Sequence, residues 1–581
     1  MRIKTTTTKN GRLFYVIKTY YDSKGKEHSV TVEKLGNEND IRTKYNCDPD
    51  VWAKKYVAKL NEQESIEQQP VQVSFSQTAR LSKNHQYTFN IGYLFLQNLY
   101  YQLGIDKICK SISKKYKFNY DLNDIFSRLI YSRIIHPCSK QATYRFASTL
   151  LEQPSFDEHQ IYRSLDVIAS ESDFIQEQLY KNSFKLGKRK SGIIYYDCTN
   201  FFFEIEAADE NGLRQYGKSK ENRPLPIVEM GMFIDSDGIP LSICIHPGNT
   251  NEQVTLKPLE QKIISDFKMS KFVVCTDAGL ASKANRKFND IQDRAFIVTH
   301  SVKKLKADLK EWALDTEGWS KYGCNPRKKH SIANLDKEKD YDAVFYKEQW
   351  IDQGSFEEKL IVTYSMKYCM YQRNIRNSQI DRARKAIEQG TARIRKKRQN
   401  DFMRFIDRIS TTNEGEVADK EKYCLNGDRI TEEERYDGYY AVVSNLDDDP
   451  REIIKVNHQR WMIEECFRIM KSEFKSRPVY VQTDDHISAH FLTCFLALVI
   501  YRHVEKKIDH AFTCEKLIAT LRDMNVRELV GEGYLPTYTR TDITDALHDA
   551  FGFRTDYQAI TKQTMKKILK SSKTTIRYAK Y

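Results

Sequence analysis

Three charged residues of a predicted helix have types and spacings that suit metal-dependent chemistry on phosphate. Arg460, Glu464 and Lys471 follow one another at intervals of four and seven residues. At about 100° per residue, these intervals place a carboxylate between two cations on one helical face. A carboxylate in that position can hold a divalent metal ion, while the cations hold phosphate. The alternative is an amphipathic helix whose charges are only solvated, and this segment alone does not exclude it.

Two aspartates upstream could complete such a site. Asp197 follows the apolar run 192–196, and Asp277 follows the run 272–276. Each run is typical of a buried central strand whose carboxyl end opens on a site. Taken singly, either Asp would more often start a turn or cap a helix. Together with Glu464, they predict three carboxylates that share a metal site.

These three segments resemble the DDE transposases of bacterial insertion sequences. The resemblance is to the subgroup whose third motif reads Tyr-x2-Arg-x3-Glu-x6-Lys (YREK), with Arg460, Glu464 and Lys471 in its last three positions. The motif spacing selects Glu464 rather than Glu465. Asn457 stands at the motif's Tyr position, so the contact that this Tyr makes in the family is not expected here. Further segments that resemble the family are 216–220 with 223–224, 246–250 and 477–480.

The resemblance implies an enzyme that cuts and joins DNA. Asp197, Asp277 and Glu464 would be both catalytic residues and metal ligands. Hard oxygen ligands favour Mg2+, with Mn2+ able to substitute. Two ions about 4 Å apart would activate the attacking oxygen and stabilise the leaving 3′ oxygen. Water would first release a 3′-hydroxyl at the element end, and this hydroxyl would then attack target DNA. Cut-and-paste transposition of this kind also implies a homodimer in the DNA complex.

Cationic side chains near the carboxylates are the expected DNA contacts. Arg460 and Lys471 would hold phosphates near the cut, and Lys475 and Arg223 are further candidates. A basic stretch, 381–398, favours contact with the DNA backbone, although a solvated charged helix is the alternative. The residues clustered at its end that we assign to DNA binding are Arg395, Lys396, Lys397 and Arg398.

In some relatives an aromatic residue of an inserted region stacks on a flipped base next to the cut. The candidates in this chain are Trp312, Trp319 and Trp350. Core packing is the alternative for each of them.

Composition agrees with a polyanionic partner. The 581 residues carry a formal charge of +14, with an isoelectric point near 8.9, and double-stranded DNA is the partner we expect. Twelve cysteines occur without a CxxC pair, which indicates a reducing compartment. The first residues do not resemble a signal peptide, and the apolar run 491–501 is too short to span a bilayer. We therefore expect a cytoplasmic, nucleoid-associated bacterial protein without a membrane partner.

The order of predicted elements gives an α/β fold class. From Ser191 the pattern β-β-β-α-β-α-β matches a ribonuclease-H-like core, a mixed sheet with helices on both faces. Glu464 follows Asp277 by 464 − 277 = 187 residues, so a β-rich insertion must interrupt this core. The expected divisions are an N-terminal β-meander region (1–62), a linker (63–75), a helical candidate DNA-end-binding domain (76–188), the first segment of the core (189–300), the insertion with its basic helix (301–447), the second segment of the core (448–507) and a C-terminal helical region (508–581).

Two other functions are compatible with some features of this pattern. A ribonuclease-H-like nuclease would only hydrolyse DNA, and the large insertion and flanking regions argue against it. A non-catalytic relative would only bind DNA, and the complete set of carboxylates argues against that. Inverted repeats around the coding region would separate a transposase from a nuclease.

Overall fold

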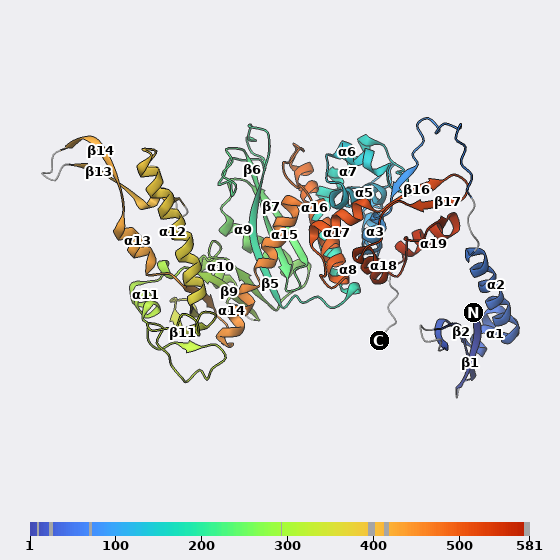
Figure 1. Cartoon of the computed structure of the whole chain (residues 1–581), viewed down its shortest axis with the longest axis horizontal. Coiled ribbons are helices and arrows are strands. Elements are labelled where there is room, and N and C mark those ends of the chain that lie inside the picture. The colour runs from blue at the N-terminus through green and yellow to red at the C-terminus, as the bar shows by residue number, and fades with distance from the viewer. Residues whose placement is uncertain are drawn as a thin grey trace. The chain divides into compact units, whose positions relative to one another are not determined.

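The computed structural model describes residues 1–8, 11–21, 27–68, 73–291, 293–392, 401–411 and 417–574 (Figure 1). The chain divides into two compact units. The first contains Met1–His85 with Leu529–Gly533, and the second contains Gln86–Glu528 with Tyr534–Tyr581. The residues that the sequence assigns to chemistry lie in the second unit.

The first unit combines a small antiparallel sheet with two helices. Its elements are β1 (Arg2–Thr8), β2 (Gly11–Tyr21), β3 (Glu27–Asn37), α1 (Glu38–Tyr45) and α2 (Pro49–Gln68). The strands pair in chain order. The range predicted as a linker, 63–75, is wrong at its start because α2 continues to Gln68. Glu and Gln are good helix formers, so a segment rich in both prolongs the helix.

A nine-stranded mixed sheet is the centre of the second unit. In spatial order its strands are β10 (Ser320–Lys321), β11 (Val344–Asp352), β12 (Glu357–Ser365), β15 (Tyr439–Ser444), β9 (Arg294–His300), β8 (Phe272–Thr276), β5 (Ile193–Phe202), β6 (Ile227–Asp235) and β7 (Pro240–Pro247). Strands β5, β8 and β9 are parallel neighbours. The other pairs in the sheet are antiparallel.

The region predicted as an insertion adds strands to this sheet. Strand β15 pairs with β9, from Ala441 opposite His300 to Ser444 opposite Ile297, and β12, β11 and β10 follow outward. The region is therefore continuous with the sheet, apart from a two-stranded hairpin. Its other elements are η2 (Val302–Lys304), α11 (Ala307–Leu314), α12 (Met366–Glu388), η3 (Phe402–Phe405), β13 (Ile406–Thr411), β14 (Val417–Leu425) and α13 (Gly427–Glu434).

The three tryptophans of this region differ in burial. Trp319 is fully buried in the core between the sheet and α11, so it has the packing role that was the alternative to base stacking. Trp312 is partly buried against the same core. Trp350 is 44% exposed.

Helices cover both faces of the sheet around β5. Tyr196 packs against α9 (Glu252–Asp266), as do Ile194 and Cys198 on the same face of β5. Tyr195 points the other way, and its hydroxyl donates to the backbone oxygen of Val456 at 3.2 Å. Val456 belongs to α14 (Pro450–His458). Because side chains alternate along a strand, Asp197 lies on the α14 side of the sheet. A short helix, α10 (Lys283–Phe288), follows β8.

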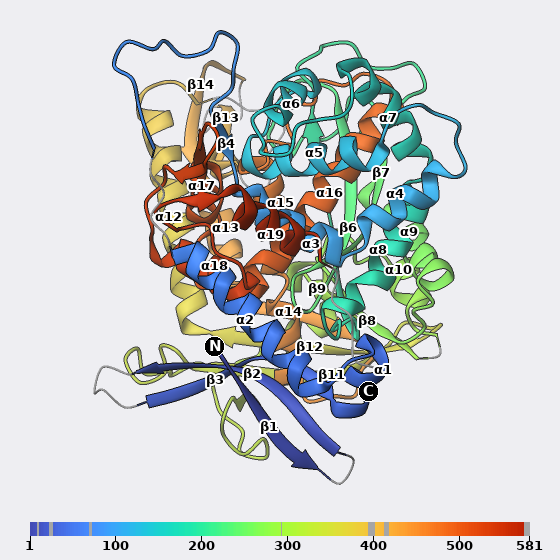
Figure 2. The ribbon, with the colours of Figure 1, turned by 90° about the vertical axis from the view of Figure 1, so that its right-hand side faces the viewer.

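The apolar helix α16 (Asp484–Lys507) lies inside this unit. It packs against helices that precede the sheet in the chain, against β7 and against α15 (Trp461–Ser472) (Figures 1 and 2). By length and composition α16 could cross a membrane, but 94% of its apolar window is buried within the protein, as in a core helix. The helices that precede the sheet are α3 (Tyr93–Gln102), α4 (Ile105–Ser113), α5 (Leu122–Ile135), α6 (Lys140–Ala147), α7 (Glu158–Ser170) and α8 (Ser172–Ser183), with η1 (Phe184–Leu186).

The carboxyl-terminal region is not purely helical, contrary to the prediction. Its short strands form a sheet with β4 (Thr88–Asn90), in which Asn525 lies opposite Asn90. A pairing between such distant segments leaves no local pattern in the sequence. The elements of the region are α17 (Cys514–Asp523), β16 (Asn525–Leu529), β17 (Gly533–Pro536), α18 (Asp542–Phe551), β18 (Ile560–Thr561) and α19 (Lys562–Ser572).

A buried carboxyl group on α9 makes stability depend on pH. Glu260 is fully buried; one oxygen accepts from Asn289 Nδ2 at 2.8 Å, and the other has no partner among the described residues. Burial raises the pKa of Glu260 from 4.5 to about 8. The unfolded chain therefore releases this proton at lower pH than the folded chain, and stability falls as pH rises from about 4.5 to about 8.

Replacing this carboxyl group tests that dependence. Glu260→Gln keeps a similar shape without the ionisation, so we expect it to flatten the pH dependence. Near pH 8 it should raise the free energy of unfolding by roughly 2–4 kcal/mol. Denaturant unfolding across this pH range measures the effect. Glu515→Gln, at an exposed position of α17, is the control and should behave as wild type. Equal pH dependence of wild type and Glu260→Gln would contradict the expectation.

Candidate active site

Asp197 lies inside a strand and not at its end, which corrects the prediction from the sequence. Strand β5 continues to Phe202 because its antiparallel pairing with β6 runs from Ile194 to Phe202 and includes Asp197 opposite Met232. The parallel pairing with β8 is shorter and stops at Tyr195 opposite Cys275. Asp197 therefore sits just beyond the end of the parallel ladder.

The two aspartates are in register on neighbouring strands. The β5–β8 ladder joins positions 275 − 195 = 80 residues apart, and 277 − 197 gives the same value. The β8–β9 ladder, with Thr276 opposite Val298, likewise brings Thr299 level with Asp277. Adjacent strands are about 4.8 Å apart, so Asp197, Asp277 and Thr299 form one row across three parallel strands. We call these three residues the carboxylate row, after its two aspartates.

A tight turn fixes Asp277. Its Oδ1 accepts the backbone N–H groups of Gly279 at 3.0 Å and Leu280 at 3.1 Å. A Cβ atom at Gly279 would lie 3.3 Å from the carboxylate oxygens of Asp277. The absent side chain at position 279 therefore leaves the approach to this carboxylate open.

Burial and like charge both act on Asp197. Its Oδ1 accepts the N–H of Cys198 at 2.7 Å. Burial raises the pKa of Asp197 to about 6, opposed first by the positive charge of Lys220. The negative charge of Asp277 adds to the rise, whereas Arg460 opposes it. Asp197 is therefore ionised less readily than a free aspartate, and a cation bound beside it would favour its ionised form.

Helix α15 is anchored over the carboxylate row at both ends. Arg460, its N-cap residue, donates from Nη1 to Thr299 Oγ1 at 3.1 Å. Lys471 donates from Nζ to Thr199 Oγ1 at 2.7 Å, and Thr199 lies two residues after Asp197 on the same face of β5. Both cations therefore contact threonines on strands of the central sheet, Thr299 on β9 and Thr199 on β5.

Glu464 lies in the first turn of α15, between these anchors, where the helix dipole favours a carboxylate. Its side chain is exposed and lines a cavity of about 610 Å³ with Arg460 and Trp461. The neighbouring Glu465 is held by Arg468, with Nη2 to Oε1 at 2.6 Å and Nε to Oε2 at 2.7 Å. Of these two glutamates, Glu464 is the one that lines this cavity, whose lining includes Arg460 but neither aspartate.

Asp197, Asp277 and Glu464 do not form a compact set of metal ligands, because their ligand atoms do not all lie within 4.8 Å of one another. Among the described residues, the ligand atoms of Asp545, His548 and Asp556 do meet that distance.

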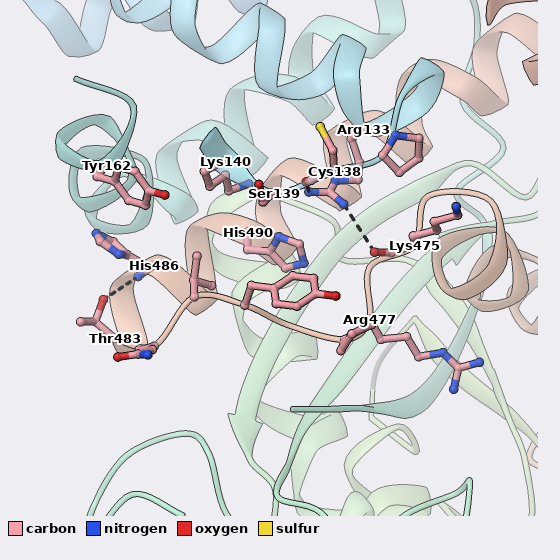
Figure 3. A pocket seen from close by; sticks show the side chains of 15 residues that line it. Arg133, Cys138, Ser139, Lys140, Tyr162, Lys475, Arg477, Thr483, His486 and His490 are labelled. Carbon is pink, nitrogen blue, oxygen red and sulfur yellow. Dashed lines mark hydrogen bonds between the residues drawn. The ribbon is translucent and has the colours of Figure 1, made fainter. Parts of the chain in front are cut away.

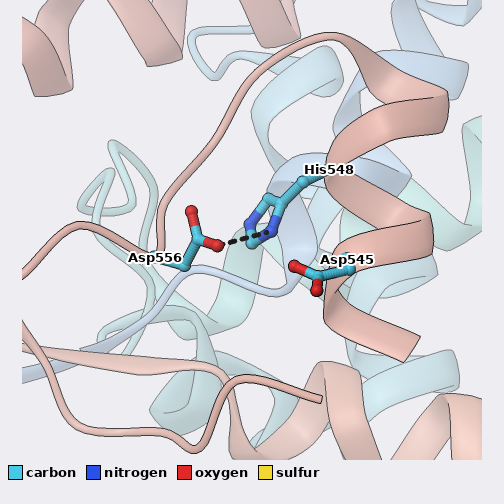
Figure 4. A group of neighbouring side chains, drawn as sticks. All are labelled: Asp545, His548 and Asp556. Carbon is cyan, nitrogen blue, oxygen red and sulfur yellow. Dashed lines mark ion pairs between the residues drawn. The ribbon is translucent and has the colours of Figure 1, made fainter. Parts of the chain in front are cut away.

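The Asp545, His548 and Asp556 group (Figure 4) is an ion-pair cluster. Arg554 pairs with Asp545 at 2.8 Å and with Asp556 at 2.7 Å. His548 Nε2 accepts the N–H of Thr555 at 3.2 Å, so the neutral ring carries its proton on Nδ1, which faces Asp556 at 3.6 Å. Both carboxylates are paired with Arg554, whereas His548 Nδ1 has no hydrogen-bond partner among the described residues.

Asn457, at the motif's Tyr position, is a buried link between three elements. Its Oδ1 accepts from the Tyr440 hydroxyl on β15 at 2.5 Å, and its Nδ2 donates to Thr299 Oγ1 on β9 at 3.3 Å. Tyr440 lines the same cavity as Glu464. Asn457 therefore positions a residue of the row and an aromatic residue of the neighbouring strand.

Lys220 is the main contributor to the site that the sequence did not identify. Its Nζ pairs with Glu252 Oε1 at 3.0 Å and also donates to the Cys198 backbone oxygen. Burial lowers the pKa of Lys471 to about 8, and the charge of Lys220 adds to this effect. Lys220 belongs to the segment 216–220, which the family resemblance had already singled out.

The other predicted DNA contacts lie further from the row. Arg223 is exposed, and its guanidinium stacks on Phe202 at 4.3 Å. Lys475 is exposed and lines a second cavity. Four predicted contacts lie outside the described residues: Arg395, Lys396, Lys397 and Arg398.

Comparison with known proteins identifies a protein family, and it finds distant likeness to solved structures. One of these structures is a piggyBac transposase synaptic complex with hairpin DNA, at 10% identity over 81% of this chain and 86% of that chain, with a TM-score of 0.33. A likeness this low does not define the fold. No curated protein matches the chain significantly.

The family called "Transposase DDE domain" matches residues 204–500, which is 297 of 581 residues. The matched range contains Asp277 and Glu464 and begins seven residues after Asp197. Because this match covers half of the chain, the protein belongs to the transposase DDE domain family.

Proposed function

We propose that this protein binds the ends of an insertion sequence, cleaves them by metal-dependent phosphodiester hydrolysis and joins the 3′-hydroxyl ends to target DNA. The observation that carries the proposal is the carboxylate row, with α15 anchored over it through Arg460 and Lys471. Cationic side chains can hold a negatively charged phosphodiester, and a pair of carboxylates can bind the metal ions that polarise it.

The strand order supports a ribonuclease-H-like core for this site. Reading β7-β6-β5-β8-β9, the first chain segment lies in the middle of these strands, with an antiparallel pair on one side and parallel neighbours on the other. In such a core Asp277 lies beside Asp197, because β8, which ends just before Asp277, is the direct neighbour of β5.

The donor set fits Mg2+, with Mn2+ able to substitute. Asp197, Asp277 and Glu464 offer only carboxylate oxygens, which are the ligands that hard divalent cations prefer. Burial and the charge of Asp277 both raise the pKa of Asp197, and a cation bound beside the two aspartates would oppose both effects. Two bound ions would supply the Lewis acidity that activates the attacking hydroxyl and stabilises the leaving oxygen.

The cationic side chains of the site would have two roles, to favour the ionised form of Asp197 and to hold phosphates. Lys220 and Arg460 favour the ionised form of Asp197, which is the form that binds cations. Arg460 and Lys471 now donate to threonine hydroxyls, and phosphate oxygens would be stronger acceptors for both. We infer that these two cations hold phosphates on either side of the bond that is cut. Joining two element ends would bring two copies of the chain together on DNA.

Single carboxylate replacements test the assignment of the three ligands. We expect Asp197→Asn, Asp277→Asn and Glu464→Gln each to lower Mg2+-dependent cleavage of an end-bearing duplex by at least about 100-fold, because each removes a ligand charge. Gel-shift assays should show that end binding survives. Glu465→Gln is the matched control and should cleave as wild type does. An active Glu464→Gln with an inactive Glu465→Gln would show that the helix register is wrong.

Thermal unfolding without DNA tests the charge balance of the carboxylate row. In a chelator, Asp197→Asn should raise the melting temperature by a few degrees, since it removes a buried charge beside Asp277. Mg2+ should then stabilise wild type more than the variant. Asp235→Asn is the contrasting control, because Asp235 is a buried carboxylate whose Arg189 partner is 2.6 Å away, and its loss should lower the melting temperature. A destabilised Asp197→Asn would contradict the proposed imbalance.

Strand transfer separates a transposase from a nuclease. Precut ends with free 3′-hydroxyl groups, incubated with a supercoiled plasmid and Mg2+, should be joined to the plasmid. Sequencing of the junctions measures the reaction. Hydrolysis of uncut ends without joining of precut ends would favour a nuclease that does not transfer strands.

A further inference from the structure

A second cavity, of about 600 Å³, lies away from the carboxylate row and is lined by cations (Figure 3). It lies between α5, the start of α6 and the segment 475–483 that leads into α16. Among the residues that line it, none is acidic. Its basic lining residues are Arg133, Lys140, Lys475, Arg477, His486 and His490. We call it the cationic cavity.

Lys140 has a buried ammonium group without a partner. The residue is 5% exposed, and its Nζ has no hydrogen-bond partner among the described residues. Burial lowers its pKa to about 7, and the charge of Arg133 adds to the effect. A buried charge of this kind is costly unless something compensates it. The folded chain therefore buries an unpartnered amine at a place where an anionic ligand would favour its charged form.

The groups around Lys140 also favour an anion. Arg133 is 4% exposed, and its guanidinium is held in place by the backbone oxygens of Phe474 and Cys138, each at 3.2 Å. Helix α6 begins at the cavity, with Ser139 as its N-cap residue. The amino end of a helix is a favourable place for a phosphate group. His490 is neutral, because burial lowers its pKa well below 6.5, and it contacts the Ser476 backbone oxygen.

Ion pairs connect the cationic cavity to the carboxylate row. Arg477 lines the cavity and pairs with Glu221. Glu221 also lies 3.7 Å from Lys471 Nζ, and Lys471 in turn contacts Thr199 on β5. A strand held by Lys471 at the carboxylate row could therefore continue past Arg477 into the cavity.

An exposed aromatic ring favours a nucleic acid over a free anion. Tyr480 lines the cavity and is 66% exposed, so it stands at the open side. Such a ring offers a stacking surface for a base next to a bound phosphate.

We propose that the cationic cavity holds one phosphate group of the DNA strand that passes the carboxylate row, with the Lys140 ammonium group as its buried partner. This inference rests on the proposed function, since it places a second contact on the DNA that the active site cuts. It assigns to Lys140 and Arg133, in the region before the sheet, a direct role in holding that strand.

Thermal unfolding in inorganic phosphate tests the anion site without DNA. The variant Lys140→Met keeps the length and apolar stem of the side chain but removes its charge. We expect phosphate to raise the melting temperature of wild type above that in chloride at equal ionic strength, and to give no such rise in Lys140→Met. In chloride, Lys140→Met should be at least as stable as wild type. A less stable variant would show that the ammonium group is structural, and the proposal would be wrong.

Duplex binding at several salt concentrations, in a chelator, tests the DNA assignment. Lys140→Met should bind about 10-fold more weakly at low salt, and its slope of log K against log salt should be smaller by about 1. The control is Lys271→Met, which removes an exposed lysine that pairs with Asp293 at the opposite end of β8 from Asp277; it should bind as wild type does.

The outcomes separate this inference from the proposed function. A phosphate effect with unchanged DNA binding in Lys140→Met would identify a free-anion site and overturn the DNA assignment. Unchanged behaviour in both assays would overturn the proposal entirely. Because neither assay contains Mg2+, a wild type that binds DNA without cutting it when Mg2+ is supplied would refute the proposed function and leave the cavity's assignment standing.

Discussion

Repulsion between two carboxylates is the constraint around which this region of the chain is built. The register of β5 and β8 places Asp197 and Asp277 side by side. Burial, and then the charge of Asp277, raise the pKa of Asp197, and the positive charges of Lys220 and Arg460 oppose that rise. Lys220 comes from a loop, and Arg460 and Lys471 come from the two ends of α15. Arg460 and Lys471 also donate to threonines of β9 and β5, and these two contacts anchor α15 to strands that carry the row.

The buried helix α16 connects the sheet to the helices that precede it in the chain. A helix that is apolar on all sides has to be enclosed, and here helices from before the sheet enclose it together with β7 and α15. The divisions 76–188 and 448–507 therefore share one hydrophobic core. This shared core holds α5 and α6 in place next to the segment 475–483, so the cationic cavity has fixed walls relative to the carboxylate row.

Local patterns are enough to propose Asp197 and Asp277 as ligands and the cations of α15 as their neighbours, but they indicate neither Thr299 nor the register of β5 and β8. The role of Lys220 could not be predicted, because it depends on how a loop folds back onto β5. The surroundings of Lys140 likewise include residues more than 300 positions away that line the same cavity, such as Arg477. Such contacts are set by tertiary packing and leave no periodicity in the sequence.

Asn457 shows how a departure from the family motif can serve the same site. A buried amide has to satisfy both its donor and its acceptor, and Asn457 does so by joining β9 to Tyr440 of β15. Strand β15 is the point at which the inserted strands join the sheet. The amide therefore ties the end of α14, and through it the start of α15, to the inserted region. In this chain the inserted strands help to determine where Arg460 and Glu464 lie, so the inserted region is part of the framework of the candidate active site and is not a separate module.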